Sequence, residues 1–282
     1  MARILIVGCG RLGRPLGNLL ANLGHEVVGI RRSPPPGSPD RINWLSMDIT
    51  KTETFRLLPA DFQQIIIILT PASRSPQGYK EIYQQGLKNL LGHFQQCQYS
   101  PAYIFVSATS VYAQQQGQWV NETSETLPLS YNGKSLLDAE NQVMRFSERA
   151  LVIRFSGIYG AERTRLIQKL EKPVEIQQTP SVYTNRIHQD DCVGVLQHLA
   201  IKQLAGEKLY PVYLATDYDS ATKFEMMKWL AAEAGLVAPI PLVAADDAPR
   251  NKRCCNKRLV ESGYQFKYRG FKDGYRAMLD IE

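Results

Sequence analysis

Three glycines near the amino terminus have the spacing of a phosphate-binding loop. Gly8, Gly10 and Gly13 form a Gly-x-Gly-x-x-Gly motif directly after the apolar residues 4–7. The first glycine permits a tight turn, the second lets backbone approach a pyrophosphate, and the third lets the next helix pack on the strand. That helix presents N–H groups and a partial positive charge to an anion. The motif predicts a dinucleotide-binding loop made of Gly8, Gly10, Arg11, Leu12 and Gly13.

Arg31 and Arg32 follow the second predicted strand, beside the expected position of a cofactor ribose. A fold that prefers NAD places an acidic residue here to bind the ribose 2′-hydroxyl. Guanidinium groups instead pair with a 2′-phosphate through forked hydrogen bonds. We therefore expect a preference for NADP(H), with NAD(H) as the alternative cofactor. A solvated basic pair without a ligand is the other interpretation.

Alternating strands and helices must position these residues. The β-rich runs are residues 3–7, 26–30, 43–47, 64–69, 102–106 and 150–154. Such alternation predicts an α/β fold of the Rossmann type, a doubly wound parallel sheet with helices on both faces. We assign residues 1–154 to this dinucleotide-binding domain. Residues 155–282 form a small C-terminal α+β lobe on the substrate side, interleaved with the main fold rather than independent, with helices at 190–201, 222–234 and 271–279.

Apolar side chains recur at helical spacing in two of the connecting segments. We interpret both sets as core-facing stripes rather than as parts of a cofactor site. The sets are Leu12, Leu16, Leu19, Leu20 and Leu23, and Ile82, Leu87, Leu90, Leu91 and Phe94.

Composition and charge limit the class of protein. The chain has 282 residues, of which 44% are hydrophobic and 21% charged, as in soluble globular proteins. Its five cysteines are odd in number and lack zinc-site spacing, so we expect reduced thiols in the cytoplasm and no metal. The net charge of +6 is dispersed, and apolar runs are short. We therefore expect a small-molecule substrate and neither nucleic acid nor membrane as a partner.

One local basic cluster remains open to two interpretations. Its members are Arg250, Lys252, Arg253, Lys257 and Arg258. Such a cluster is usually a solvated face, and the alternative is a pocket for an anionic substrate.

Further motifs follow the glycine loop in order. They are Met47-Asp48-Ile49, residues 105–112 ending in Val111-Tyr112, residues 151–160, and Arg186-Ile187-His188-Gln189-Asp190-Asp191. In this order and spacing the chain resembles the extended short-chain dehydrogenase/reductase superfamily, within it the NAD-dependent epimerase/dehydratase family and its atypical YeeZ-like branch. The resemblance covers nearly the whole chain.

The resemblance implies roles for individual residues. It places Asp48 and Ile49 at the adenine and Arg154, Arg186 and His188 on the substrate side. The nicotinamide ribose would be lined by Thr70, Pro71 and Ala72. The family also implies hydride transfer on a small or sugar-derived substrate and, by analogy, a homodimer.

His188 also admits a structural interpretation. A histidine beside carboxylates can act as a general base. An Asp just before the apolar run Val193, Val195, Leu196 and Leu199 is a good helix N-cap, and we favour that role for this segment.

The family's three catalytic positions hold other residues here. Members use a Ser or Thr four residues before the tyrosine of the Val-Tyr pair and a Tyr-x-x-x-Lys on the next helix. In this alignment the positions hold Ala108, Asn132 and Leu136. Asn is no proton donor of tunable pKa, and Leu cannot favour a phenolate.

Tyr131, Lys134 and Thr109 are the replacement candidates. A spacing of three residues puts Tyr131 and Lys134 on roughly one helix face, where the ammonium would favour the phenolate. Gly133 between them and Pro128 before them argue that the helix has not begun at Tyr131. Surface or capping roles are the other interpretation.

Two functional hypotheses follow. The first is an NAD(P)-binding oxidoreductase or epimerase-like enzyme with substituted catalytic positions. The second is a non-catalytic dinucleotide-binding regulator or scaffold, which would bind cofactor without turnover. The sequence identifies neither the substrate nor the reaction direction.

Overall fold

A computed structural model describes residues 1–35, 40–96, 100–161 and 163–279. The chain divides into two units. Unit 1 comprises Met1–Val111, Thr126–Arg154 and Val193–Tyr213, and unit 2 comprises Tyr112–Glu125, Phe155–Cys192 and Leu214–Glu282. The expected boundary after Arg154 coincides with one of the points at which the chain passes from unit 1 to unit 2. Residues 193–213 return to unit 1, because they contain most of a helix that packs on its sheet and the first part of a strand within that sheet. Residues 112–125 belong to unit 2.

The sheet of unit 1 has seven strands in the order β3-β2-β1-β4-β5-β7-β11. Their bounds are β1 (Arg3–Val7), β2 (Glu26–Arg31), β3 (Asn43–Ser46), β4 (Gln64–Ile67), β5 (Ala102–Ala108), β7 (Ala150–Phe155) and β11 (Val212–Ala215). β1 pairs in parallel with both β2 and β4. The strand order thus reverses at β1, which creates the crevice that binds ligands in open α/β sheets. The predicted Rossmann-type fold is confirmed.

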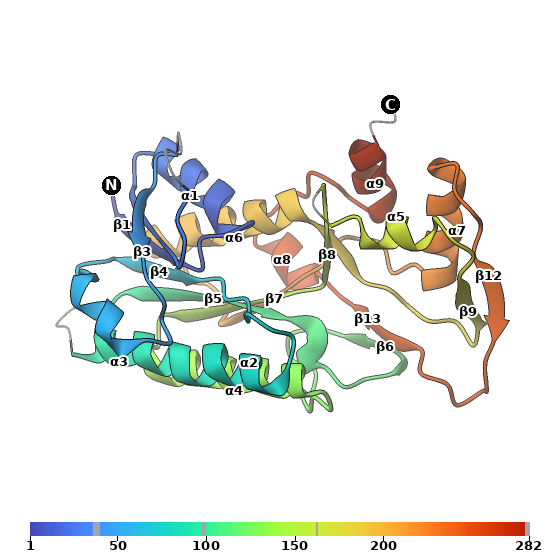
Figure 1. Ribbon diagram of the computed structural model, residues 1–282, viewed down its shortest axis with the longest axis horizontal. Coiled ribbons are helices and arrows are strands. Elements are labelled where there is room, and N and C mark those ends of the chain that lie inside the picture. Colours follow the sequence, from blue (N-terminus) through green and yellow to red (C-terminus); the bar gives the residue numbers. More distant parts are fainter. Residues whose placement is uncertain (36–39, 97–99, 162, 280–282) are drawn as a thin grey trace. The chain divides into compact units, whose positions relative to one another are not determined.

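Helices cover both faces of this sheet (Figure 1). One face carries α1 (Gly13–Asn22) and α6 (Gln189–Leu204), and the other carries α2 (Pro76–Tyr79), η2 (Lys80–Gly86), α3 (Leu87–Gln95) and α4 (Tyr131–Phe146). Short 3₁₀ turns are η1 (Thr52–Leu57) and η3 (Thr109–Val111). Because both faces are covered, Ile4, Leu5 and Ile6 of β1 and Ile65, Ile66 and Ile67 of β4 are all completely buried.

The helix after β4 is interrupted by a π-helical segment, η2. Its wider turn changes which side chains face the sheet. Tyr83 is buried and donates a hydrogen bond to the Leu69 carbonyl (3.0 Å), whereas Ile82 is only half-buried. The predicted core stripe is therefore wrong at Ile82, although Leu87, Leu90, Leu91 and Phe94 are buried as expected.

The prediction that five leucines in and around α1 face the core is correct for three of them. Leu16 and Leu20 are completely buried and Leu12 nearly so, but Leu19 and Leu23 are exposed. The helix packs on the sheet along a narrower stripe than expected.

The described residues of unit 2 form three small two-stranded sheets and four helices that lie wholly within the unit. The strand pairs are β6 (Gln116–Val120) with β13 (Asn251–Cys254), β8 (Gly157–Tyr159) with β10 (Arg186–His188), and β9 (Glu175–Thr179) with β12 (Ile240–Val243). The helices are α5 (Arg165–Lys169), α7 (Lys223–Glu233), α8 (Lys257–Glu261) and α9 (Phe271–Leu279). Tyr159, Leu170, Leu230, Phe271 and Tyr275 are among the residues that form its core. The helices predicted near 190–201, 222–234 and 271–279 are confirmed.

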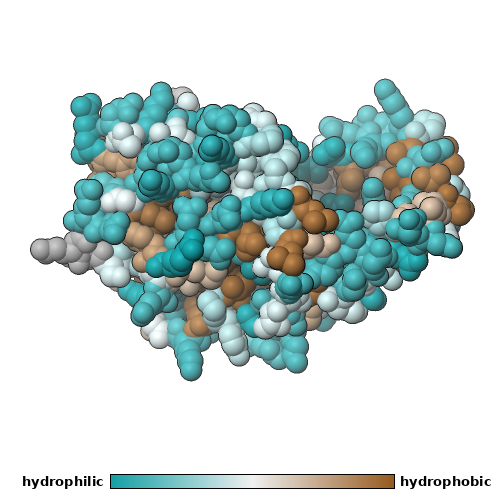
Figure 2. All heavy atoms as spheres, turned by 90° about the horizontal axis from the view of Figure 1, so that it is seen from below, coloured by the Kyte–Doolittle hydropathy of each residue, from teal (hydrophilic) through white to brown (hydrophobic). Residues whose placement is uncertain are grey.

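The molecular surface is mixed in character. Figure 2 shows one face on which hydrophilic residues predominate and hydrophobic residues gather in local patches. Across the described residues, exposed apolar side chains include Leu129 (73%) and Val243 (76%). In the described part of the chain, no helix combines the length and apolarity needed to cross a membrane.

Candidate functional site

A cavity of about 290 Å³ lies in unit 1, at the carboxyl ends of β1, β2 and β4. Its lining comes from the glycine loop, the ends of these strands and the segments after β3 and β4. The predicted cofactor residues among the lining are Gly8, Gly10, Arg31, Arg32, Asp48, Ile49, Thr70 and Ala72. The remaining predicted residues, Arg11, Leu12, Gly13 and Pro71, lie in the same segments but do not line it. The cavity therefore occupies the crevice at which the strand order reverses.

Gly8 occupies a position that only glycine fits. Its φ is +83°, and a Cβ atom there would lie 2.1 Å from the Ile68 carbonyl oxygen. Gly10 differs, because an added Cβ would have no atom nearer than the Gly8 oxygen at 3.9 Å. Protein packing thus requires glycine at the first position. At the second, the bare backbone faces open space that a ligand can use.

The helix α1 begins immediately after the loop. The Arg14 N–H donates to the Gly10 carbonyl (2.8 Å), which starts the helical hydrogen bonding. A Cβ on Gly13 would lie 3.0 Å from Ile6, so this glycine lets α1 pack closely on β1. The loop has the strand–turn–helix context that a phosphate-binding motif needs.

The basic pair lies at the rim of the same cavity. Arg31 and Arg32 are exposed at the end of β2, and both line the cavity. Their backbone is fixed by β3, since the Met47 N–H donates to the Arg31 carbonyl (3.1 Å) and the Ser46 hydroxyl donates to the Arg32 carbonyl (3.0 Å). The side chains are thus placed beside this cavity without an ion-pair partner among the described residues.

Asp48 shapes the loop that follows β3. Its Oδ1 accepts hydrogen bonds from the backbone N–H (3.0 Å) and the hydroxyl (2.8 Å) of Thr50. Thr50 lines the cavity and was not predicted, and neither were Gly78, Glu81 and Ile82. The last three reach the cavity through the helix that contains η2, whose π-helical turn leaves no recognisable spacing in the sequence.

The three candidate catalytic residues do not form an evident catalytic group. α4 begins at Tyr131, contrary to the expectation that Pro128 delays it, because the Ser130 hydroxyl caps the helix by accepting from the Gly133 N–H (3.3 Å). The Tyr131 hydroxyl donates to the Arg74 carbonyl (2.7 Å). Lys134 is exposed, and no hydrogen bond or ion pair joins its side-chain ammonium to the described residues, whereas Thr109 is half-buried in η3.

Arg154 is committed to a buried ion pair inside unit 1. Its guanidinium contacts Glu140 of α4, with Nη2 2.6 Å from Oε2 and Nε 3.0 Å from Oε1. The two side chains are 5% and 0% exposed. Through this ion pair Arg154 links β7 to α4.

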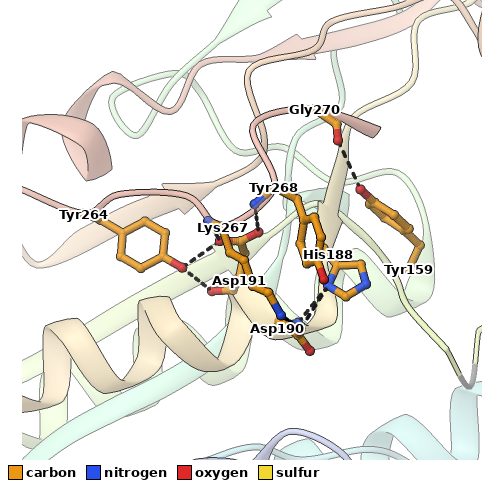
Figure 3. Close-up of polar contacts among 8 residues, drawn as sticks. All are labelled: Tyr159, His188, Asp190, Asp191, Tyr264, Lys267, Tyr268 and Gly270. Carbon is orange, nitrogen blue, oxygen red and sulfur yellow. Dashed lines mark hydrogen bonds and ion pairs between the residues drawn. The ribbon is translucent and has the colours of Figure 1, made fainter. Parts of the chain in front are cut away.

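His188 is a helix cap in unit 2. Its Nδ1 accepts a hydrogen bond from the Asp190 N–H (3.1 Å) in the first turn of α6, so Nδ1 carries no proton and the ring proton is on Nε2. Burial lowers the pKa of His188, which keeps the ring neutral. The ring contacts Tyr159 and Tyr268 (Figure 3). The predicted Asp cap is therefore wrong, because the histidine accepts the hydrogen bond instead.

Asp191 fastens the C-terminal segment to the start of α6 (Figure 3). Its Oδ1 accepts from the Tyr264 hydroxyl (2.8 Å) and the Lys267 N–H (2.7 Å), and its Oδ2 accepts from the Tyr268 N–H (3.0 Å). Lys267 also pairs with Asp190 at 2.6 Å. With every hydrogen bond directed to this segment, Asp191 has a structural role.

The C-terminal basic cluster separates into local contacts within unit 2. The Arg253 guanidinium lies over the rings of Trp119 and Tyr183, at 5.0 and 4.7 Å from their centroids. Arg258 lies 3.8 Å from Glu122. These contacts favour structural roles over a shared anion pocket. Among the described residues, no group of three or more potential ligands could hold a metal ion. Cys97 lies outside the described residues.

A family model described as the RmlD substrate binding domain matches residues 2–281. The chain belongs to this family. The expected membership of the extended short-chain dehydrogenase/reductase superfamily is thereby confirmed.

Individual relatives share different parts of the chain. Protein YeeZ of Escherichia coli K12 is 28% identical over 58% of this chain, and the match spans 61% of YeeZ's own length. dTDP-4-dehydrorhamnose reductase of Aggregatibacter actinomycetemcomitans is 24% identical, over 87% of this chain and 84% of the reductase. This chain is thus similar to part of YeeZ and to most of the reductase.

Two solved structures share the fold over nearly the full length. A Methylobacillus flagellatus protein, provisionally named as an NAD-dependent epimerase/dehydratase, has a TM-score of 0.81 and 30% identity over 99% of this chain and 98% of its own. UDP-glucuronic acid 4-epimerase from Bacillus cereus, solved in complex with NAD, has a TM-score of 0.74 and 20% identity over 99% and 97%.

Ala108, Asn132 and Leu136 lie in β5 and α4. Ala108 ends β5 half-buried, Asn132 lies in the first turn of α4, and Leu136 is 6% exposed and packs in the interior. Ser107 and Ser110 beside them have buried hydroxyl oxygens without a hydrogen-bond partner among the described residues. The glycine loop and the cavity beside it are thus formed in the structure.

Proposed function

We propose that this chain binds NADP(H) in preference to NAD(H) and belongs to the hydride-transferring members of its family. The observation that carries the proposal is the cavity of about 290 Å³ that joins the glycine loop to Arg31 and Arg32. Its volume is at the lower end of ligand pockets and suits the nucleotide end of a dinucleotide. The NAD complex of the B. cereus epimerase supports the assignment of a nicotinamide dinucleotide.

The lining residues fit the parts of this cofactor. Gly8 and Gly10 offer bare backbone to the diphosphate, and the amino terminus of α1 supplies partial positive charge. Arg31 and Arg32 would hold the 2′-phosphate, and Asp48 the adenine. When bound, the nicotinamide supplies or accepts a hydride.

The substrate class is a small sugar-derived molecule, in line with the nucleotide sugars named for several relatives. Proton transfer needs a group other than the family's Ser, Tyr and Lys. Tyr131 is the available phenol in unit 1 near the start of α4, and its hydroxyl is now directed to the Arg74 carbonyl. Turnover through Tyr131 would require this hydrogen bond to open.

The test is a titration of the purified protein with NADPH and NADH, followed by nicotinamide fluorescence at fixed salt. The Arg31→Ser, Arg32→Ser double variant should bind NADPH roughly tenfold more weakly or worse, because hydrogen bonds between charged groups contribute about 1.5–3 kcal/mol each. NADH binding should change little. Arg56→Ser is the matched control, since Arg56 is exposed and lies outside the cavity lining. Equal losses for NADPH and NADH would overturn the preference.

A second candidate function is a cofactor-binding regulator or scaffold. The observation that favours it is the replacement of the three catalytic positions by Ala108, Asn132 and Leu136. Under this alternative NADPH binds tightly, no carbonyl or alcohol substrate supports hydride exchange, and Tyr131→Phe changes nothing. Hydride exchange with any substrate class would exclude it.

A further inference from the structure

A short segment of unit 1 forms part of the wall of the dinucleotide cavity. It comprises residues 70–75, which connect the end of β4 to α2 and are named the strap. Two of its residues, Thr70 and Ala72, line the cavity. Most of the strap is exposed to water, and only Pro71 and Ser75 are half-buried. The strap thus separates part of the cavity from solvent.

The chain that leads into the strap is held firmly. The Tyr83 hydroxyl donates to the Leu69 carbonyl (3.0 Å), and Tyr83 is only 4% exposed. The Ile68 N–H donates to the Val7 carbonyl of β1 (2.8 Å). Because these hydrogen bonds are buried in the fold, opening them would leave polar groups unpaired away from water. The first end of the strap is therefore fixed to the sheet.

The far end of the strap is held by a tyrosine that water can reach. The Tyr131 hydroxyl, at the start of α4, donates to the Arg74 carbonyl (2.7 Å). Tyr131 is 42% exposed, and Arg74 is exposed as well. Across the described residues, no other hydrogen bond joins residues 70–74 to α4 or to the sheet. Water can replace an exposed hydrogen bond at small cost, so this end can open while the first end stays fixed.

Gly78 provides the surface on which the strap rests. A Cβ atom on Gly78 would lie 2.5 Å from both the carbonyl oxygen and the hydroxyl of Ser73. The Gly78 N–H donates to the Ser75 hydroxyl (3.1 Å), which lies 2.8 Å from the Ser73 hydroxyl. Gly78 also lines the cavity. The strap therefore closes against bare glycine backbone at the cavity wall.

Tyr131 is oriented by an aromatic neighbour. Its ring lies edge-on to the ring of Tyr79, with centroids 5.4 Å apart, and Tyr79 in turn packs against Tyr83 at 5.5 Å. Rings at such distances attract one another in this arrangement. Phenylalanine at position 131 would keep the ring contact and lose only the hydroxyl. The effect of the hydrogen bond to Arg74 can therefore be measured separately.

We propose that the strap closes the cofactor cavity and that Tyr131 is a positioning residue that latches it. When the hydrogen bond from Tyr131 to Arg74 opens, the strap moves away from Gly78 about its fixed end and widens the route into the cavity. The dinucleotide enters and leaves through the open form and is held by the closed one. This inference rests on the proposed function only in naming NADP(H) as the ligand.

Limited proteolysis by trypsin measures the opening of the strap in the free protein. Trypsin cleaves after Arg74 in the strap and after Arg56, an exposed arginine in η1 that serves as the reference site. Tyr131→Phe should raise the cleavage rate at Arg74 about two- to tenfold, the factor expected when the closed form loses one net hydrogen bond. Cleavage at Arg56, separated by peptide mass spectrometry, should not change. Equal acceleration at both sites, or none at Arg74, would overturn the proposal.

Gly78→Ala disturbs the strap from its other side. The added methyl group would push on Ser73, so cleavage at Arg74 should again rise several-fold. Gly92→Ala is the matched control, because Gly92 also lies in a helix of unit 1 but an added Cβ there meets no atom within 4 Å. Equal cleavage rates in the two glycine variants would overturn the closure of the strap on Gly78.

Stopped-flow fluorescence of NADPH measures entry and exit directly. In Tyr131→Phe the association and dissociation rate constants should both rise about two- to tenfold, because the open form is more populated with and without ligand. The same hydrogen bond is lost from the free and the bound protein, so the Kd should change by no more than about twofold. Tyr218→Phe is the control, since Tyr218 is similarly exposed (47%) and belongs to unit 2.

The rate constants distinguish a latch from a direct contact with the ligand. A rise in the dissociation rate constant alone, with a matching rise in Kd, would mean that Tyr131 touches NADPH and would overturn the latch. Unchanged rate constants would overturn it as well. If NADPH does not bind at all, the cofactor assignment fails, and faster cleavage at Arg74 in Tyr131→Phe still supports the latch.

Discussion

Replacing Gly8 by Ala tests the structural basis of the cofactor loop. At φ +83° an L-residue costs about 1–2 kcal/mol. The new methyl group would also lie 2.1 Å from the Ile68 oxygen. That carbonyl belongs to a backbone held to β1 by the hydrogen bond from the Ile68 N–H to Val7 (2.8 Å), so it cannot move freely. Overpacking costs a further ~1–3 kcal/mol. We expect Gly8→Ala to lower the free energy of unfolding by about 2–5 kcal/mol in total.

Gly24→Ala is the matched control. Gly24 has nearly the same φ, +86°, but an added Cβ would meet no atom within 4 Å. In this variant the free energy of unfolding should fall by only about 1–2 kcal/mol, the conformational cost of an L-residue at this φ. Urea unfolding followed by circular dichroism gives both free energies of unfolding. Equal losses in the two variants would refute the argument that the Ile68 carbonyl enforces glycine at position 8.

Gly10→Ala separates stability from binding. Its Cβ would have 3.9 Å of clearance, so the free energy of unfolding should change by no more than about 1 kcal/mol, the difference in backbone entropy and propensity. NADPH affinity should fall roughly tenfold or more, because the methyl group would occupy space that the loop leaves to the diphosphate. Unchanged affinity would show that the diphosphate does not approach Gly10.

Other predictions concern single side chains. Glu140→Gln should lower the free energy of unfolding by about 3–5 kcal/mol, because the buried guanidinium of Arg154 loses the opposite charge of Glu140, and Glu140→Leu with Arg154→Met should recover much of this loss in urea titrations. Folding lowers the pKa of His188, so the neutral ring contributes to the free energy of unfolding above the unfolded pKa near 6.5, and this contribution is lost as the pH falls below that value. His188→Gln should flatten that part of the plot of unfolding free energy against pH, and an unaltered plot would contradict the cap. Burial raises the pKa of Cys9 to about 12, so iodoacetamide at pH 8 should leave native Cys9 unmodified while half-buried Cys255 reacts, as peptide mass spectrometry will show. Fast labelling of Cys9 would mean that the loop opens.

Much of the fold could be predicted because its signals are local. The strands of unit 1 carry consecutive apolar residues, as at 65–69, and the glycine loop lies between a strand and a helix that are both recognisable by period. The positions of Arg31 and Arg32 follow directly from where β2 ends. These elements adjoin in sequence, so the cavity they line could be anticipated before its shape was known.

Other features depended on contacts between distant segments. The return of β11 to the sheet, the π-helical turn that directs Ile82 to the cavity, and the burial of Arg154 against Glu140 have no local signal.

The sequence by itself therefore determined the parallel sheet and its phosphate-binding loop, because periodicity and glycine spacing are properties of neighbouring residues. Only the tertiary structure decided which polar side chains form hydrogen bonds or ion pairs with distant residues. Asp191 accepts hydrogen bonds from a segment more than seventy residues away, whereas Arg186 Nε has no hydrogen-bond partner among the described residues. Such pairings depend on which distant segments the folded chain brings together. A buried charged group has a structural role where folding gives it a partner of opposite charge.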